Sequence, residues 1–436
     1  MLRTLTAATA TADLTVRTGV VQQLSGLVIE ARGPDAVLGE VCSIAVRGQA
    51  EPLQAEVVGM RAGQVTLMPY GSSQGLAPGC EVTASGELAS IGVGPALLGR
   101  VIDGFGRALD GRPDPATTER RLVKGKPLNP MHRPRIEKVM ETGVRTIDAL
   151  LTLGQGQRVG IFAGSGVGKS TLLGMVARHV RADVNVIALI GERGREVREF
   201  IDKQLGEEGL ARSVVVVATS DQPALARLRA AYAAVTIAEA FRDEGKQVML
   251  TMDSIARFAM ARREVGLSAG EPPTARGYTP SVFAELPELC ERCGTSGQGG
   301  AITALLTVLV EGDDLNEPVT DCLRATLDGH IVLSRQLANQ GQYPAIDALK
   351  SVSRLMPDLA TGEEQALAVK AVEYLALLDR NRQLVDIGAY VRGTNAALDR
   401  AIDLEPQLLA FLKQSSGGVA RHLAVQQLAG LLKGAA

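Results

Sequence analysis

A glycine-rich segment, GIFAGSGVGKST over residues 160–171, has the residue types and spacing of a phosphate-binding loop. An apolar run over residues 158–163 enters it, and TLLGMVARHV leaves it as a helix, which is the strand–loop–helix context that a P-loop requires. Glycines let backbone N–H groups approach phosphate closely, and the helix presents its positive end to the same anion. We predict that nucleotide phosphates contact Gly164, Ser165, Gly166, Val167, Gly168, Lys169, Ser170 and Thr171.

The Gly-Lys-Ser triplet of this segment predicts how the nucleotide and its metal are held. Lys169 is expected to reach the β- and γ-phosphates of ATP, and the Ser170 hydroxyl to hold Mg²⁺. The usual pattern opens with glycine where this chain has Ala163, a variant that adds only a methyl group. The alternative is an ordinary strand-to-helix turn. It is disfavoured because the Gly-Lys-Ser triplet stands at the expected position between the apolar strand and the following helix.

Hydrolysis also needs a carboxylate beside the metal and a group that orients the attacking water. Asp253 ends the apolar run QVMLTMD, where it is expected to support Mg²⁺, partly through water; the alternative is a helix N-cap before SIARFAMARR. Glu192 follows the apolar run NVIALI and is our candidate for polarising the water. Its alternative, one more solvated acid in the charged run GERGREVRE, is about equally good from composition alone.

Three regions of different pattern must position these residues. Short apolar runs separated by turn residues over about 16–95 predict a small β-barrel or sandwich, and residues 94–135, rich in Gly, Pro and Arg, a connector. From about 140, near-continuous apolar strands alternate with helical stretches, which predicts a mainly parallel sheet covered on both faces, an α/β core. Three amphipathic helices follow residue 360. The predicted domains are 1–95, 96–360 and 361–436.

Composition excludes several classes of function. In 436 residues, 46 Lys plus Arg stand against 48 Asp plus Glu, and aromatic residues are only 3%, so the broad basic or base-stacking surface of a nucleic-acid-binding protein is not expected. Five cysteines in a chain of this length do not form a disulfide framework. The start lacks a secretory apolar region, and the longest apolar stretch, 301–310, is half a membrane span. We expect a cytoplasmic protein.

Four separated blocks, GSGVGKST, GERGREVREF, MLTMDSIARFAMARRE and DGHIVLSRQLANQGQYPAIDALKSVSRLM, together resemble the ATPases of type III secretion and flagellar protein export. That family is homologous to the α and β subunits of rotary ATP synthases, and the resemblance covers nearly the whole chain from about residue 20. It implies an N-terminal β-barrel, a central RecA-like P-loop NTPase domain and a C-terminal helical domain, the order predicted above without it.

The resemblance also implies a role for each residue that matches a family motif. It implies phosphate and Mg²⁺ binding by Lys169, Ser170 and Thr171, catalysis by Glu192, phosphate contact by Arg193, metal support by Asp253, packing on adenine by Tyr343, and an arginine finger for a neighbouring subunit at Arg354. Without that context, Tyr343 would more simply be a residue that fills core space.

The presence of both the catalytic glutamate and the arginine finger in one chain predicts how the protein assembles. Rotary synthases place the catalytic glutamate and the finger on different subunits, whereas this chain has both Glu192 and Arg354. Complete sites can then form only between copies of the chain, which predicts a homohexamer with poor activity as a monomer. The family implies further partners: a peripheral stator protein, a coiled-coil stalk protein, export-gate membrane proteins at the inner membrane, and export chaperones with their substrates.

Our interpretation is a Mg²⁺-dependent ATPase that energises flagellar-type protein export, and several alternatives stay open. The virulence injectisome branch shares all the residues that do the chemistry; DIGAYVRGTNAALDRAI in the helical tail favours the flagellar branch only weakly. An RNA-translocating hexameric ATPase, a non-catalytic nucleotide-binding subunit and a rotary synthase subunit are less favoured. Docking of a stator protein by the first 18 or so residues is doubtful, because they are short and weakly amphipathic.

Two further segments have a functional and a simpler interpretation. Residues 265–287, with clustered Gly and Pro, correspond to loops that line the central channel in the family, although a mere connector fits equally well; Arg276, Tyr278 and Phe283 are the first to mutate. Cys290 and Cys293 form a C-x-x-C with no second pair or suitable histidine nearby. Structural zinc needs four ligands, so we expect these two cysteines to be packing residues.

Overall fold

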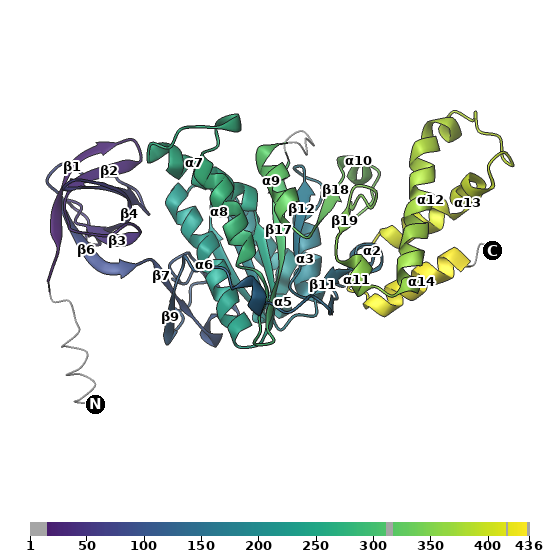
Figure 1. The fold of residues 1–436 in the computed structure, drawn as a ribbon, viewed down its shortest axis with the longest axis horizontal. Helices are drawn as coiled ribbons and strands as arrows, with labels where there is room; N and C mark the ends of the chain where they lie inside the picture. The colour runs from purple at the N-terminus through teal and green to yellow at the C-terminus, as the bar shows by residue number, and fades with distance from the viewer. Residues whose placement is uncertain (1–14, 311–316, 416, 434–436) are drawn as a thin grey trace.

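The computed structural model describes residues 15–310, 317–415 and 417–433, and it divides into three parts along its longest axis (Figure 1). A β-barrel lies at one end, a sheet with helices on both faces lies in the middle, and a helical domain lies at the other end. The α/β fold class and the order of the three parts predicted from the sequence are confirmed. None of the described helices is long and apolar enough to cross a membrane.

The N-terminal part is a closed, six-stranded antiparallel barrel in the order β1-β2-β5-β4-β3-β6. Alternate residues of its strands point inward and form a core of their own, in which Ile29, Cys42 and Leu67 are fully buried. Its strands are β1 Thr18–Ser25, β2 Val28–Arg32, β3 Glu40–Ile44, β4 Leu53–Arg61, β5 Gln64–Pro69 and β6 Glu81–Leu88.

The central sheet has the strand order β19-β18-β12-β17-β15-β13-β14-β8. All neighbours in this path are parallel except β19, which pairs antiparallel with β18 at one edge. Its strands are β8 Arg100–Ile102, β12 Arg158–Ala163, β13 Val184–Ile190, β14 Ser213–Ala218, β15 Gln247–Asp253, β17 Ala301–Leu309, β18 Gly329–Leu333 and β19 Val352–Ser353, with β16 Gly294–Thr295 antiparallel to β17. The segment 94–135 is therefore more than a connector, because it supplies β8 to the sheet.

Helices cover both faces of this sheet, as continuous apolar strands require. Along β12, Phe162 belongs to one apolar core while Val159 and Ile161 belong to the other. The first core is covered by α6 Ala224–Asp243, α7 Ile255–Ser268, α8 Pro280–Glu291 and α9 Pro318–Thr326, and the second by α2 Arg145–Leu150, α3 Lys169–His179, the π-helical turn η3 Phe200–Leu205 and α10 Arg335–Asn339.

The C-terminal domain consists of the three predicted helices, α12 Gly362–Asp386, α13 Ala396–Leu412 and α14 Arg421–Lys433. A capping box at Thr361 and Glu364 begins the first of them. Gln414 connects the domain to the core, because its buried side-chain amide donates to the Gly143 carbonyl and accepts from the Arg145 backbone N–H.

The remaining elements are short and connect the elements described above. They are β7 Ser90–Val93, η1 Pro95–Leu97, β9 Glu119–Leu122, η2 Pro130–His132, β10 Val139–Met140, β11 Leu153–Gly154, α4 Gly194–Glu199, α5 Gly206–Ala211, η4 Ala275–Gly277 and α11 Met356–Leu359.

Candidate active site

The glycine-rich loop joins the end of β12 to the start of α3, as the sequence predicts. Gly166 and Gly168 have φ angles of 76° and 89°, in the left-handed region that favours glycine. A Cβ on Gly168 would also lie 3.2 Å from the ring of Tyr343. Ser170 and Thr171 are exposed in the first turn of α3, where the backbone N–H groups have no helical partner. The loop thus has the backbone conformation and the accessible donors of an anion cradle.

Lys169 lies between two carboxylates. Its Nζ is 2.5 Å from Oδ1 of Asp253 and 3.5 Å from Oε1 of Glu192. Burial opposes the charge on this ammonium, but the two carboxylates more than compensate and raise the pKa of Lys169 above its usual value. Three residues from three separate sequence blocks therefore meet at one point beside the P-loop.

Asp253 ends β15 and is 3% exposed. Ser254, the next residue, caps α7 with its side chain, which accepts from the Arg257 backbone N–H. Because Ser254 fills the capping role, the alternative of Asp253 as an N-cap is wrong. The second partner of Asp253 is Thr307, whose buried hydroxyl donates to Oδ1 over 2.7 Å.

Thr307 was not predicted from the sequence. It lies in β17, the strand between β12 and β15, and faces the end of β15 from there. The available signal was a hydroxyl near the end of the otherwise mainly apolar run AITALLTVL. Only the strand order makes it a neighbour of Asp253.

Glu192 lies just after β13 and has an unusual protonation equilibrium. Burial and the nearby carboxylate of Asp253 raise the pKa of Glu192 to about 7, although Lys169 acts in the opposite direction. A carboxyl group that titrates near neutral pH is suited to take a proton from water. The alternative of a fully solvated acid does not describe it, since its side chain is 17% exposed.

Arg193 and Tyr343 are placed differently from these three. The Arg193 side chain is 78% exposed and its Nη1 lies 3.6 Å from Oε1 of Glu196, so it does not point at Lys169 in this structure. Tyr343 is 43% exposed and lies beside Gly168, and its carbonyl accepts from the backbone N–H of Gln414 in the helical domain. It is therefore not a core-filling residue.

Arg354 is exposed, directly after β19 at the edge of the sheet. Its backbone N–H donates to the Asp328 carbonyl over 3.0 Å, and its Nη2 donates to the Arg324 carbonyl over 3.1 Å. Within the described part of the chain, no hydrogen bond or ion pair joins it to the P-loop, Glu192 or Asp253. Of the four predicted catalytic side chains, the structure thus brings Lys169 and Glu192 together, turns that of Arg193 toward Glu196, and leaves Arg354 apart.

The residues of the other two segments are also resolved. Arg276 is exposed on the turn between α7 and α8, Phe283 is half-buried, and Tyr278 is buried with its ring 6.0 Å from that of Phe283. Cys290 and Cys293 are buried, and burial raises the pKa of Cys293 to about 12, which makes it a poor metal ligand or nucleophile.

The donors at the P-loop fit a nucleotide with Mg²⁺. Carboxylate and hydroxyl oxygens are the ligands that Mg²⁺ prefers, and Asp253 and Ser170 supply one of each. The ammonium of Lys169 and the open backbone of Gly166, where a Cβ would meet nothing within 4 Å, suit the phosphates. A P-loop on a mainly parallel sheet, with a carboxylate at the end of a neighbouring strand, defines a P-loop nucleotide-binding protein.

Comparison with known proteins identifies the family. Residues 143–353 match the nucleotide-binding domain of the ATP synthase alpha/beta family, residues 21–86 its β-barrel domain, and residues 360–429 the C-terminal domain of the type III secretion ATPase EscN. The "Flagellum-specific ATP synthase" of Bacillus subtilis is 55% identical over 92% of this chain and 91% of its own length. The chain belongs to this family, the flagellum-specific and type III secretion ATPases.

Two further similarities agree with this assignment. The "Type 3 secretion system ATPase" of Xanthomonas euvesicatoria is 49% identical over 91% of this chain and 90% of its own length. The structure of the assembled ATPase EscN from enteropathogenic E. coli superposes with a TM-score of 0.90 at 42% identity, over 95% of this chain and 100% of that one.

Proposed function

We propose that this protein hydrolyses ATP with Mg²⁺ at sites shared between neighbouring copies. In each site one copy supplies the P-loop, with Lys169 and Ser170 binding phosphate and metal and Tyr343 packing on the base. Glu192 accepts the proton of the attacking water, and Arg193 contacts phosphate after turning inward from its exposed position. Ser170 and Asp253, the latter partly through water, would hold Mg²⁺, which would supply charge neutralisation at the phosphates.

The position of Arg354 is the observation that supports a shared site. Its backbone is bonded to Asp328, which also contacts Arg158 at the amino end of β12, whereas the P-loop follows the carboxyl end of β12. The backbone of Arg354 and its own P-loop therefore lie at opposite ends of a six-residue strand, which is about 20 Å long at ~3.3 Å per residue. An arginine side chain does not span that length, so Arg354 can serve as a finger only in another copy.

A ring of six copies is the assembly we propose, with each Arg354 directed at the next P-loop. A heterologous interface repeated around an axis closes into a ring when its rotation allows. Solved structures of EscN show it assembled and in complex with its central stalk EscO, which supports a ring and a coiled-coil stalk partner here. We further propose a cytoplasmic ring that docks on the membrane export gate and a peripheral stator protein, and that receives chaperone-bound substrates.

Flagellar export is the branch we favour. The flagellum-specific relatives from Bacillus subtilis, Treponema pallidum and Salmonella typhimurium are 55%, 54% and 51% identical to this chain, above the 49% of two type III secretion ATPases, while three other flagellum-specific relatives are 48%, 47% and 46% identical. Flagellar basal-body genes beside this gene would support the assignment, and needle-complex genes there would contradict it.

The shared site predicts that ATPase activity depends on protein concentration. Dilution should dissociate the ring, and each chain then loses the finger of its neighbour, which is worth about 10³–10⁵ in rate. Phosphate release per chain is expected to rise steeply with concentration, in parallel with the ring fraction measured by mass photometry. Equal turnover per chain in demonstrably monomeric and ring-forming samples would contradict the shared site.

The raised pKa of Glu192 predicts an acid limb in the pH profile. Glu192 must be a carboxylate to accept a proton, so kcat/KM is expected to decrease about tenfold per pH unit as the pH falls below about 7 and to level off above it. Steady-state kinetics over roughly 1.5 pH units on either side of that pKa would measure this. Glu192→Gln is the control, and an unchanged acid limb in that variant would assign the limb to another group.

A further inference from the structure

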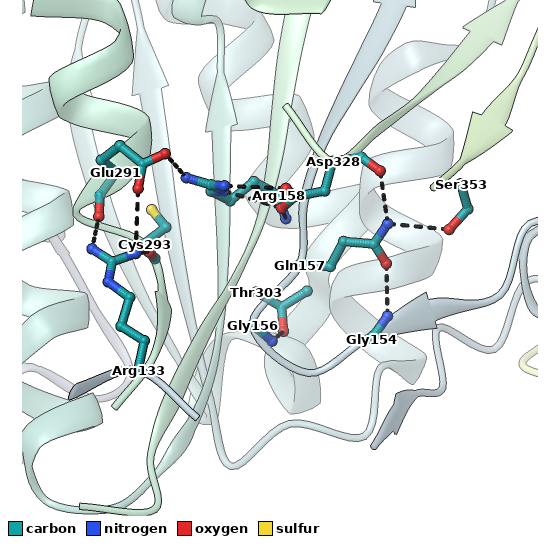
Figure 2. A network of polar contacts seen from close by, with 10 residues as sticks. All are labelled: Arg133, Gly154, Gly156, Gln157, Arg158, Glu291, Cys293, Thr303, Asp328 and Ser353. Carbon is teal, nitrogen blue, oxygen red and sulfur yellow. Dashed lines mark hydrogen bonds and ion pairs between the residues drawn. The ribbon is translucent and has the colours of Figure 1, made fainter. Parts of the chain in front are cut away.

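We propose that Asp328 is a positioning residue, which holds the backbone of Arg354 so that this side chain can enter the neighbouring copy's site. This inference rests on the proposed function of Arg354 as a finger in trans. It is drawn from a polar network at the amino end of β12 (Figure 2). The P-loop follows the other, carboxyl end of that strand.

The segment that carries Arg354 has few attachments of its own. The strand β19 is only two residues long, and its partners in β18 are Gly329, opposite Ser353, and His330, opposite Val352. The strands lie so close that a Cβ on Gly329 would be 2.6 Å from the Val352 carbonyl oxygen. The Arg354 side chain is exposed and its Nη2 donates to the Arg324 carbonyl, so its direction depends on that hydrogen bond and on how this short strand is held.

Asp328 connects that strand to β12, the strand that leads into the P-loop. Its carbonyl accepts the backbone N–H of Arg354, while its carboxylate binds Arg158 three times: Oδ2 accepts from the backbone N–H and Nε, each over 3.0 Å, and Oδ1 accepts from Nη2 over 3.1 Å. Such a forked arginine–carboxylate pair fixes direction as well as distance. The Arg158 side chain is only 15% exposed and also pairs with Glu291 at the end of α8.

Gln157 makes a second connection on the same strand. Its Nε2 donates to the Asp328 carbonyl over 3.3 Å and to Oγ of Ser353 over 3.1 Å, while its Oε1 accepts from the Gly154 backbone N–H. Ser353 in turn donates to the Thr152 carbonyl. Figure 2 shows this chain of contacts leading from Arg158 through Asp328 and Gln157 to Ser353, the residue before the finger.

The network therefore connects the P-loop strand of one site to the finger that serves the next. None of its side chains touches Lys169, Glu192 or Asp253 among the described residues, so loss of the Asp328 carboxylate should leave nucleotide binding in its own chain intact. It should instead shift Arg354, and a misplacement of about 1 Å can lower a rate about 10²-fold. The defect should appear in the site of the neighbour.

The test is Asp328→Asn in full-length rings, assayed alone and in mixtures. Alone, kcat is expected to fall about 10²-fold with KM and the affinity for a fluorescent ATP analogue unchanged. Mixed with an equal amount of Glu192→Gln chains, it should recover activity, because about a quarter of the boundaries then combine an intact Glu192 with a correctly held Arg354. Mixed with Arg354→Ala, it should recover none, because both variants lack a working finger.

Asp110→Asn is the matched control. Asp110 forms a forked pair with Arg100 of the same kind, with Nε–Oδ2 2.8 Å and Nη2–Oδ1 3.1 Å, beside β8 and away from Arg354. Any loss in this variant should be a stability loss that Glu192→Gln chains do not restore. Ser353→Ala is the second variant, for use if Asp328→Asn does not fold. We expect it to lower kcat several-fold, to recover activity when mixed with Glu192→Gln chains, and to recover none when mixed with Arg354→Ala chains.

Three outcomes would overturn the inference. They are unchanged kcat in Asp328→Asn and Ser353→Ala, a loss accompanied by weaker nucleotide binding, and a loss that Glu192→Gln chains cannot restore. The mixture of Arg354→Ala with Glu192→Gln separates these from failure of the proposed function. If that mixture recovers activity and the Asp328→Asn mixture does not, the shared site stands and only the positioning role is lost; if neither recovers, the shared site fails as well.

Discussion

Arg354→Ala is expected to lower kcat for ATP hydrolysis by about 10³–10⁵-fold, the usual value of an arginine finger. The side chain lies at the edge of the sheet, and among the described residues its guanidinium makes one hydrogen bond, to the Arg324 carbonyl, so its removal should disturb the fold little. Ring formation and nucleotide affinity, measured by mass photometry and fluorescence, are expected to stay close to wild type. A loss of activity explained by dissociated rings would contradict this interpretation.

Mixing makes the prediction specific to a shared site. Arg354→Ala chains keep Lys169 and Glu192, and Glu192→Gln chains keep Arg354, so rings formed from equal amounts should be active at about a quarter of their boundaries. Phosphate release after the two are mixed, unfolded and reassembled together would measure the recovery. A mixture no more active than its components would show that both residues act in one chain.

Glu192→Gln is expected to lower kcat by about 10²–10⁴-fold, the usual contribution of a general base. The substitution keeps the size of the side chain and removes the charge 3.5 Å from the Lys169 ammonium. Asp253 remains 2.5 Å from that ammonium, so Lys169 stays paired and ATP is expected to bind at least as tightly. Single-turnover kinetics and equilibrium binding would separate the two effects.

Glu199→Gln is the matched control for this prediction. Glu199 lies at the end of α4, its side chain is 45% exposed, and it pairs with Lys203 over 2.8 Å. Its substitution is expected to change kcat only slightly. If both variants lost activity equally, charge in this segment, and not a proton acceptor at Glu192, would explain the result.

Much of this site could be predicted because its signals are local. The P-loop is one continuous segment in which glycine spacing, Lys169 and the helix start all lie within a few residues. Glu192 and Asp253 each follow an apolar strand, and parallel strands bring their carboxyl ends to one edge of the sheet. Residue types next to strand ends were therefore enough to place three distant blocks together.

Other features depended on strand order, which the sequence does not state. Thr307 contacts Asp253 only because β17 is the neighbour of β15, and β8 joins the sheet although three residues carry little periodic signal. Asp328 and Arg158 are 170 residues apart and each looked like an ordinary charged residue. Their pairing requires β18 to lie beside β12.

Local pattern and side-chain type were enough to predict the chemistry of this protein, since they specify the residues that we expect to bind phosphate and the carboxylates that follow the strands. Which partners these residues have, and where Arg354, the proposed finger, lies, follow only from the packing of the strands. Hydrogen bonding across a sheet joins segments regardless of their distance along the chain, so the position of Arg354 at the far end of β12 from its own P-loop appears only once the strands are assembled.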